Sequence, residues 1–559
     1  MLELTSPQGV EIRRPNYRIT ALIIASALFM EQLDSTVLAT ALPTMARYFD
    51  VSPSHMSVAL TSYLLTLAVL IPASGSVADR FGARTVFCAA IAGFTLSSIL
   101  CAQANSLGLL VLARLLQGAA GAMMIPVGRL VLLRSVDRAD LISAMSWFLV
   151  PGLIGPILGP PVGGMIVTYL DWRWIFYINV PIGVLGVALA WAFIENTRAT
   201  TRQAFDLRGF VLSGVSLSCL LFGFETTSRS VGSAWLAGAL IGAGLLSGAA
   251  YVAHALPARR TTPILDLTLM RIKTFRVSMI AGSLSRITQG AQPFLLPLMM
   301  QLAFGMSAAQ SGLLTFATTG GSVMMKGFAG PLLRRFGFRG VLIWNGVLSS
   351  LLYATCAAFR QNWPHWSLFL VLAICGSSMS LQFTAYNTVA YDDVPPERIA
   401  AANSFYTTFQ QLMLSFGICS GALALTVSEA LSGRIEARVG DFSAAFLVVT
   451  AISLIAAPVC LAYPRDAGDS MSGRRRTTGG IGGGSERRLI AGAISLTKPA
   501  RSLIGWVLHR NMRRSGSVKR SWTGKPAFLP YSLSGGPLRR LCSVSRRSRP
   551  TSRAVALER

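Results

Sequence analysis

The strongest constraint on this chain is a series of apolar stretches that are each long enough to cross a lipid bilayer. A membrane-spanning helix needs about 20 mostly apolar residues. Fourteen windows of the sequence meet that need, namely 18–41, 56–77, 84–104, 107–132, 141–168, 174–194, 208–225, 233–254, 275–301, 308–330, 340–359, 366–390, 400–428 and 442–463. The sequence therefore predicts an all-α polytopic membrane protein with fourteen transmembrane helices, grouped as six, two and six.

The composition excludes several other classes of protein. Only 13% of the 559 residues are charged and 52% are hydrophobic, whereas soluble domains carry about 25% charged residues. The chain contains no P-loop, no HExxH and no nucleophile elbow, and its eight cysteines form no CxxC pair. We therefore expect neither an enzyme nor a disulfide scaffold, and we expect no cofactor and no metal site.

The net charge of +27 is concentrated near the C-terminus. Residues 464–559 hold 21 Lys and Arg against 4 Asp and Glu, a net charge of +17, which leaves +10 for residues 1–463. Three interpretations of this tail stay open: a disordered basic tail held near anionic lipid, an extension outside the selected protein, and a nucleic-acid-binding segment. The last has no recognisable fold to support it, so we expect no nucleic-acid partner.

The basic residues of the connections predict the orientation. Cytoplasmic loops of membrane proteins carry an excess of Lys and Arg. With the N-terminus in the cytoplasm, nineteen of these residues fall on the cytoplasmic side of the body and six on the other side. Because the number of spans is even, the C-terminus is expected in the cytoplasm as well.

Two loops of the chain repeat one pattern. The loop Gly75-Ser-Val-Ala-Asp79-Arg80-Phe81-Gly82-Ala83-Arg84 and the loop Gly330-Pro-Leu-Leu-Arg334-Arg335-Phe336-Gly337-Phe338-Arg339 match in Gly, Arg, Phe, Gly and Arg at identical spacing. Two homologous six-helix halves with a substrate site between them form the architecture of a secondary transporter. The predicted regions are a cytoplasmic N-terminus (1–17), an N-terminal half (18–194), an inserted two-helix linker (195–254), a C-terminal half (255–463) and the basic tail (464–559).

Three charged residues inside the first group of spans are candidates for proton coupling. Glu31 and Asp34 lie at i and i+3 of the first span, on one face of a helix. A carboxylate in the bilayer centre costs about 2.5–3.5 kcal/mol on insertion scales, and such residues usually face a cavity or a partner. Arg114 in the fourth span stays charged and needs an anion or carbonyl oxygens nearby. The alternative role for all three is structural, in hydrogen bonds or an ion pair between helices.

Glycines and polar residues in other spans suggest moving parts and a binding cavity. Gly155, Gly159 and Gly163, interleaved with Pro160 and followed by Gly164, predict a bent, closely packed fifth helix. In the first repeated loop, Asp79 can accept hydrogen bonds from a helix N-terminus, whereas its counterpart in the second loop is Arg334. Candidate substrate contacts, for which interhelical hydrogen bonding is an equal alternative, are Gln117, Gln289, Gln292, Tyr386, Asn387 and Gln410.

Four stretches of the sequence resemble motifs of one family. The loop motif of Gly75, Asp79, Arg80, Gly82 and Arg84 resembles that of the major facilitator superfamily. The stretches Leu33-Asp34-Ser35-Thr36-Val37, Arg114-Leu-Leu-Gln117-Gly118 and Gly155-x-x-x-Gly159-Pro160-x-x-Gly163-Gly164 are similar to motifs of its fourteen-helix drug:proton antiporters of the EmrB/QacA type. The resemblance implies the major facilitator fold, a bacterial inner membrane, proton coupling through Asp34 and Arg114, and, more remotely, a periplasmic adaptor protein as a partner.

These observations together predict an antiporter that exports hydrophobic or amphiphilic toxic compounds in exchange for protons. Its partners would be the small-molecule substrate, protons and the lipid bilayer. Two alternatives stay open at this stage. The protein could export one endogenous metabolite, or it could be a membrane sensor that uses the same fold without transport.

Overall fold

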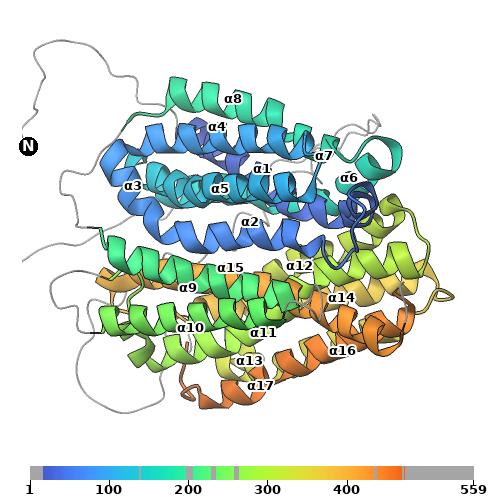
Figure 1. Cartoon of the computed structure of the whole chain (residues 1–559). Coiled ribbons are helices and arrows are strands. Elements are labelled where there is room, and N and C mark those ends of the chain that lie inside the picture. Colours follow the sequence, from blue (N-terminus) through green and yellow to red (C-terminus); the bar gives the residue numbers. More distant parts are fainter. Residues whose placement is uncertain are drawn as a thin grey trace, which may run out of the picture. The chain divides into compact units, whose positions relative to one another are not determined.

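The first half of the molecule contains helices α1 to α8. The computed structural model describes residues 17–136, 140–196, 205–227, 234–256, 263–433, 437–468 and 471, and these residues form helices and connections without a strand. The helices of the first half are α1 (Tyr17–Tyr48), α2 (Ser57–Leu70), η1 (Ile71–Ala73), α3 (Ser74–Phe81), α4 (Ala83–Ala102), α5 (Leu107–Ser135), α6 (Leu141–Tyr169), α7 (Trp174–Tyr177) and α8 (Asn179–Phe193). Figure 1 shows them together in blue and cyan.

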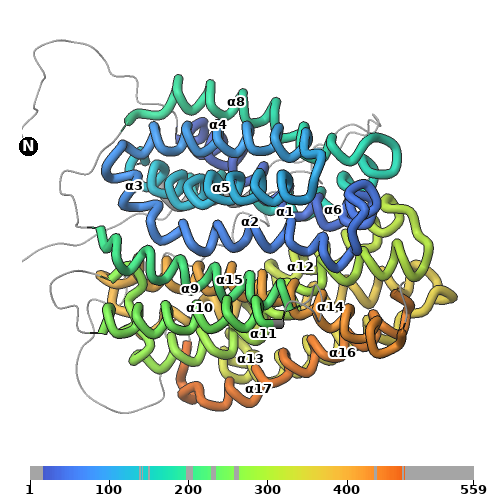
Figure 2. The backbone as a smooth tube through the Cα atoms, viewed as in Figure 1, coloured from blue at the N-terminus to red at the C-terminus, as the bar shows by residue number. Residues whose placement is uncertain are grey.

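An inserted helix pair and a second half follow. The inserted pair is α9 (Leu207–Thr227) and α10 (Ala234–Ala255). The second half contains η3 (Leu267–Arg271), α11 (Lys273–Leu298), the π-helical turn η4 (Met299–Ala303), α12 (Ala308–Phe336), α13 (Phe338–Ala354), η5 (Thr355–Ala358), α14 (His365–Val389), η6 (Pro396–Arg398), α15 (Ile399–Leu431), α16 (Val439–Leu454), α17 (Ala456–Val459) and η7 (Cys460–Ala462). The backbone trace in Figure 2 passes from the blue first half, through the green inserted pair, to the orange end of the second half.

The all-helical membrane fold predicted from the sequence is confirmed. Each of the fourteen predicted spans falls on a helix or on a short series of consecutive helices. Twelve of these segments are long and apolar enough to cross a membrane by themselves, and α11 and α12 are absent from that group although they have 26 and 29 residues. These two helices carry Gln289, Gln292 and Lys326, which line a cavity, so part of their surface faces neither lipid nor apolar core.

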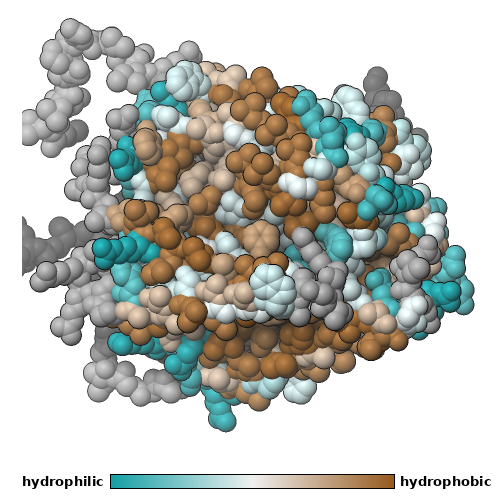
Figure 3. All heavy atoms as spheres, viewed as in Figure 1, coloured by the Kyte–Doolittle hydropathy of each residue, from teal (hydrophilic) through white to brown (hydrophobic). Residues whose placement is uncertain are grey.

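The surface of the described residues matches a position within a bilayer. Leu, Ile, Val, Phe and Trp side chains of most long helices are exposed on the outside of the bundle. Figure 3 shows hydrophobic residues over the middle of the visible face and hydrophilic residues gathered at its two ends. An exposed apolar area of this extent would be unstable in water and is stable in contact with lipid.

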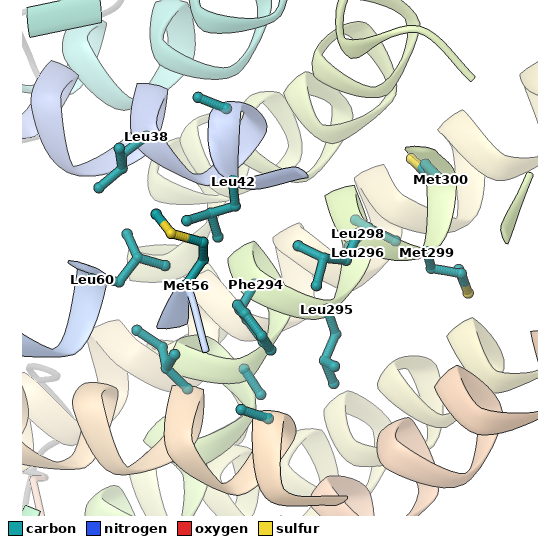
Figure 4. Close-up of a cluster of buried hydrophobic side chains, with 14 of the residues drawn as sticks. Leu38, Leu42, Met56, Leu60, Phe294, Leu295, Leu296, Leu298, Met299 and Met300 are labelled. Carbon is teal, nitrogen blue, oxygen red and sulfur yellow. The ribbon is translucent and has the colours of Figure 1, made fainter. Parts of the chain in front are cut away.

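The two halves share one apolar core at one end of the bundle, which we call the sealed end. At this end α1 finishes, α2 begins and α11 passes into η4. One continuous cluster joins Leu42 and Met56 of the first half to Phe294 and Met300 of the second half. Figure 4 shows Leu42, Met56 and Phe294 near one another, with Met300 further to the right. Toward the opposite end, the first half has a core of its own and the second half has two further clusters, one of which includes residues of α10. A smaller cluster also joins the halves, through Leu65 of α2, Leu221 of α9 and Leu412 of α15, so the sealed end holds the larger of two shared apolar contacts.

The two repeated loops adopt the same backbone arrangement. Gly82 lies between α3 and α4 with φ of 97°, and Gly337 lies between α12 and α13 with φ of 74°. Positive φ values favour glycine, which explains why both loops carry it at this position. Arg84 Nη1 donates to the carbonyl oxygen of Ile194 at 3.2 Å, and Arg339 Nη2 donates to that of Leu461 at 3.1 Å. In each half this arginine ties the loop to the end of the last long helical segment.

The predicted basic tail lies almost entirely outside the described residues. Of residues 464–559, the structure describes 464–468 and 471. The three interpretations of the tail therefore stay predictions.

Candidate functional site

A buried ion pair lies at the centre of the first half. Arg114 Nη1 of α5 donates to Asp34 Oδ2 of α1 at 2.6 Å. Both side chains are buried, with 3% of Asp34 and 0% of Arg114 exposed. The sequence predicts an anion or carbonyl oxygens near Arg114, and Asp34 is this anion. A charged hydrogen bond in a low-dielectric interior is stronger than one in water, and it also makes removal of either partner costly.

Two further polar side chains donate hydrogen bonds to the Asp34 carboxylate. Gln117 Nε2 donates to Asp34 Oδ1 at 2.9 Å, and Asn179 Nδ2 of α8 donates to the same oxygen at 3.1 Å. Gln117 Oε1 accepts from Arg114 Nη1 at 2.7 Å, while Gln117 Nε2 also donates to Ser98 Oγ of α4 at 2.9 Å. The carboxylate on α1 is therefore held directly by α5 and α8, and Gln117 links α4 to the same network.

Arg114 extends this network to α2. Its Nε donates to the carbonyl oxygen of Ala59 at 3.0 Å, and its Cζ lies 4.4 Å from the centroid of the Tyr63 ring. The cation–π contact with Tyr63 supplies a second stabilising interaction for the guanidinium. Arg114 Nη2 and the Tyr63 hydroxyl are both buried without a hydrogen-bond partner among the described residues. Both residues line a cavity of about 250 Å³.

Glu31 has a different environment from Asp34, although both lie on α1. It lines the same cavity as Arg114 and Tyr63, and only 5% of it is exposed. Its Oε2 atom is buried without a hydrogen-bond partner among the described residues. Asp34 is therefore anchored in the network, whereas Glu31 is buried at the wall of the cavity, which is a difference that their i, i+3 spacing did not predict.

Two neighbouring cavities lie between the halves. The larger one, which we call the central cavity, has a volume of about 310 Å³ and is lined by α1 and α6 of the first half and by α11, α12 and α14 of the second. The cavity of about 250 Å³ beside Glu31, which we call the adjoining cavity, shares with it the lining residues Thr36, Ala39, Gln289 and Pro293. Since both halves contribute walls, a change in the angle between the halves would change the cavity itself.

The predicted substrate contacts separate into two groups. Gln289 lines both cavities and Gln292 lines the central one. The other four lie outside both linings. Gln117 belongs to the Asp34 network, and the Tyr386 hydroxyl is 3.1 Å from Cys460 Sγ in the core of the second half. Asn387 accepts from Gln410 Nε2 at 2.7 Å, so these two residues bond to each other.

The glycines of α6 bring this helix close to α1. A Cβ atom on Gly155 would lie 3.0 Å from Gln32 Cβ, and one on Gly163 would lie 2.8 Å from the carbonyl oxygen of Val37. Gly159 has still less space, against Thr36. On a different face, Gly164 packs against the backbone of Ala308 in α12. Helix α6 runs from Leu141 to Tyr169 with Pro151, Pro156, Pro160 and Pro161 inside it, and it thus connects α1 to the second half.

The first repeated loop contains an exposed ion pair. Arg134 Nη2 of α5 donates to Asp79 Oδ1 of α3 at 2.8 Å, and both side chains are partly exposed. Arg80 is exposed, with its Cζ 5.6 Å from the Phe81 ring centroid, and a Cβ on Gly75 would meet nothing within 4 Å. The loop contacts made by Asp79 and Arg84 therefore stay within the first half in this conformation.

Sequence reasoning missed several residues of these networks. Tyr63, Ser98 and Asn179 are single polar residues within apolar stretches, a signal that is too common to single them out. Glu225 gives a clearer signal, because it is a carboxylate near the end of an apolar span. It is 1% exposed on α9, accepts from Ser57 Oγ of α2 at 2.8 Å, and lies 3.2 Å from Cys419 Sγ of α15. Through Glu225, the inserted pair contacts both halves.

Comparison with known proteins identifies the family. A family model described as "Major Facilitator Superfamily" matches residues 24–206 and 278–533, which is more than half of the chain. The chain belongs to the major facilitator superfamily, and it is a multi-pass membrane transporter and not an enzyme. The interval left unmatched, 207–277, contains α9 and α10.

Two similar relatives carry the same name. "Putative multidrug resistance protein MdtD" of Salmonella heidelberg (strain SL476) is 38% identical over 414 residues, which cover 73% of this chain and 87% of the relative. The protein of the same name from Klebsiella pneumoniae (strain 342) is 36% identical over 464 residues, which cover 82% of this chain and 97% of the relative.

Two solved structures share the fold. An auto-inhibited POT family peptide transporter has a TM-score of 0.59 at 15% identity, covering 84% of this chain and 99% of its own. The human organic anion transporter MFSD10 has a TM-score of 0.52 at 13% identity, covering 80% of this chain and 100% of its own. At these identities the similarity concerns the fold alone.

Proposed function

We propose that this protein is a proton-coupled antiporter that exports hydrophobic or amphiphilic toxic compounds by alternating access. The observation that carries the proposal is the Asp34 carboxylate, which is buried, paired with Arg114 and adjacent to cavities that both halves line. The name of the MdtD relatives supports drug resistance as the process. The membrane is the inner membrane of a bacterium, with both termini in the cytoplasm and the sealed end facing outward.

In this mechanism Asp34 carries the proton. While it is ionised, it accepts from Arg114, Gln117 and Asn179 and keeps α1, α5 and α8 together. Protonation removes its charge, so the Arg114 guanidinium loses its counter-ion and must rely on the Ala59 carbonyl oxygen and the Tyr63 ring. The proton therefore changes the forces on α2. This helix contacts α15 of the second half, because Ser415 Oγ donates to the Thr61 carbonyl oxygen at 3.2 Å.

Glu31 and the glycine motifs have supporting roles in this proposal. Glu31 faces the adjoining cavity, so it can pass protons between solvent and Asp34. The glycines of α6 let this helix move along α1 without large side chains in the way. The two six-helix halves move as units, with residues 195–254 as the inserted linker, while Arg84 and Asp79 keep the first loop attached to its own half. A periplasmic adaptor protein is supported only by the family resemblance.

The decisive experiment measures transport by Asp34→Asn. In liposomes containing the purified protein, we expect substrate-dependent proton movement from the wild type and at least a tenfold loss in the variant. In a pump-deficient host, the wild type should raise resistance across a panel of toxic compounds, and an uncoupler should abolish it. Asp171→Asn is the matched control, because Asp171 pairs with Arg173 in an exposed position outside the cavities.

The same experiment separates the alternatives. Efflux at the wild-type level that resists an uncoupler in Asp34→Asn would contradict the mechanism. Resistance to no compound on the panel, together with proton movement driven by one cellular metabolite, would identify a dedicated metabolite exporter. A sensor would give no substrate-dependent proton movement and would require the tail, whereas a transporter should tolerate truncation after residue 470.

A further inference from the structure

Lys326 of the second half lines the central cavity, and Arg286 lies behind its wall, next to Phe383. Neither side chain forms an ion pair with a carboxylate among the described residues. We propose that the cavity binds small amphiphilic anions, namely compounds with an apolar ring system and one carboxylate, and that Lys326 and Arg286 recognise the negative charge. This inference rests on the proposed function, because it names the substrate class of the same cavity.

Lys326 belongs to a polar face of α12 that lines the cavity. Thr315, Thr319, Ser322 and Lys326 follow one another at intervals of three or four residues, which places them along one side of the helix. Lys326 is an exposed residue that lines the cavity, and it forms no ion pair with a described residue. The face thus offers hydroxyl groups and one ammonium group to a ligand.

Arg286 of α11 supplies a second positive charge behind the cavity wall. Only 4% of Arg286 is exposed, and it forms no ion pair with any residue in the described part of the chain. Its Cζ lies 4.6 Å from the ring centroid of Phe383, which itself lines the cavity, and 5.8 Å from that of Tyr406. A guanidinium stays charged, and burying a charge without a counter-ion is costly. An anionic ligand in the cavity would compensate that cost.

The remaining charges around the cavity leave this positive potential in place. Lys326 is the one charged residue that lines the central cavity. In the adjoining cavity, the charged lining residues are Glu31 and Arg114, which have opposite signs, and Arg114 is also paired with Asp34. Among the residues that line the two cavities, the acidic one, Glu31, therefore belongs to the first half, and the cation without an acidic partner among the described residues, Lys326, belongs to the second.

The rest of the lining suits an apolar body of limited size. Phe383, Met379 and Pro297 provide apolar contact, and Gln289 and Gln292 provide adaptable hydrogen bonds. A volume of about 310 Å³ is at the lower end of the range for small-molecule pockets, which is about 300–1,000 Å³. A two-ring aromatic carboxylate matches both the size and the charge.

The test uses three probes that share one ring system and differ in charge: 2-naphthoate, 2-naphthylmethanol and 2-naphthylmethylammonium. Binding to the purified full-length protein is measured by titration in phosphatidylcholine nanodiscs. We expect 2-naphthoate to bind at least tenfold more tightly than the ammonium compound, with the alcohol between them. Equal or tighter binding of the ammonium compound would overturn the proposal.

Two variants and one matched control connect the affinity to the residues. Lys326→Gln and Arg286→Gln should each weaken 2-naphthoate binding about tenfold and leave 2-naphthylmethanol binding within twofold. Lys273→Gln is the control, because Lys273 is exposed at the start of α11 and lines neither cavity. If Lys326→Gln keeps wild-type affinity for 2-naphthoate, the proposal that Lys326 recognises the negative charge is wrong. This conclusion does not depend on whether Arg286→Gln folds.

Two further arms separate this inference from neighbouring questions. Binding is measured without a proton gradient, so loss of drug efflux with intact anion binding would contradict the proposed function alone. Repeating the titration with phosphatidylglycerol in the nanodiscs tests a lipid headgroup as the source of the anion. Unchanged affinity supports a soluble substrate, and loss of 2-naphthoate binding there would overturn it in favour of the headgroup.

Discussion

The two halves share a fold and differ in how they treat buried charge. In the first half, the Arg114 guanidinium is bonded to Asp34 at 2.6 Å, and Gln117 and Asn179 complete the network. In the second half, Arg286 is as deeply buried and stacks on Phe383 without an ion pair in the described part of the chain. A charge that is neutralised internally can respond to a proton, whereas one without a partner is available to a ligand.

The same contrast is visible in the repeated loops. Gly82 and Gly337 have the same type of backbone conformation, and Arg84 and Arg339 each bond to a carbonyl oxygen of their own half. The position of Asp79 in the first loop is taken by Arg334 in the second. The backbone of the repeat is thus preserved where packing requires it, and the charged positions differ where the halves have separate roles.

The largest expected effect is the difference in stability between removing Arg114 and removing Arg286. Arg114→Gln leaves the Asp34 carboxylate buried without its counter-ion, and such a loss costs about 3–5 kcal/mol. Arg286→Gln removes an uncompensated charge, so it should change stability by less than about 1 kcal/mol or increase it. Thermal unfolding of the purified proteins in detergent, with no ligand present, measures both.

This pair of variants also tests whether the comparison is correct. A large loss of stability in Arg286→Gln would mean that the second half, too, neutralises its buried charge internally. In the first half, Arg114→Lys separates the effect of the charge from the effect of the hydrogen bonds. Lysine keeps the charge, but it cannot bond to Asp34, Gln117 and Ala59 in the planar arrangement of a guanidinium.

The sequence predicted the charged site residues of the N-terminal half better than those of the C-terminal half. A carboxylate and an arginine inside apolar spans are rare enough to be noticed, so the sequence indicated Asp34 and Arg114 as candidates that each need a partner or a cavity, without indicating that they pair with each other. The residues that surround them were not foreseeable. Ser98 and Asn179 become neighbours of Asp34 only through the packing of α4 and α8 against α1 and α5.

The cavity contacts show the limit of sequence reasoning more clearly. Polar residues in apolar helices bind either a ligand or another helix, and sequence position does not distinguish the two. Gln289 and Gln292 face the cavities, whereas Asn387 and Gln410 bond to each other. The all-helical membrane fold, in contrast, depends mainly on length and hydropathy, which explains why it was predictable, although α11 and α12 are less apolar than the other twelve segments.

A smaller effect is expected at the contact between α6 and its neighbours. Gly159→Ala places a methyl group against Thr36, and overpacking of this kind costs about 1–3 kcal/mol. We expect lower thermal stability and a several-fold loss of transport in liposomes, because α1 and α6 can no longer keep their close contact. Gly242→Ala in α10 is the control, since a Cβ there would meet nothing within 4 Å. Equal behaviour of the two variants would remove the case for close packing as the function of the glycine motif.

The smallest effect is expected in the loops, where the halves differ at the surface. Asp79→Asn breaks an ion pair with Arg134 whose side chains are 34% and 27% exposed, and pairs of this kind contribute about 0.2–1 kcal/mol. Arg334→Gln changes the equivalent position of the second half, which is exposed, so we expect no measurable change in stability.

Transport rates in liposomes decide whether the Asp79 pair has a role beyond stability. If Asp79 helps to control the approach of the halves, Asp79→Asn should reduce the rate several-fold while Arg334→Gln leaves it unchanged. Equal rates in the two variants would mean that the loops contribute their backbone, through Gly82 and Gly337, and that the difference in charge between them does not affect transport.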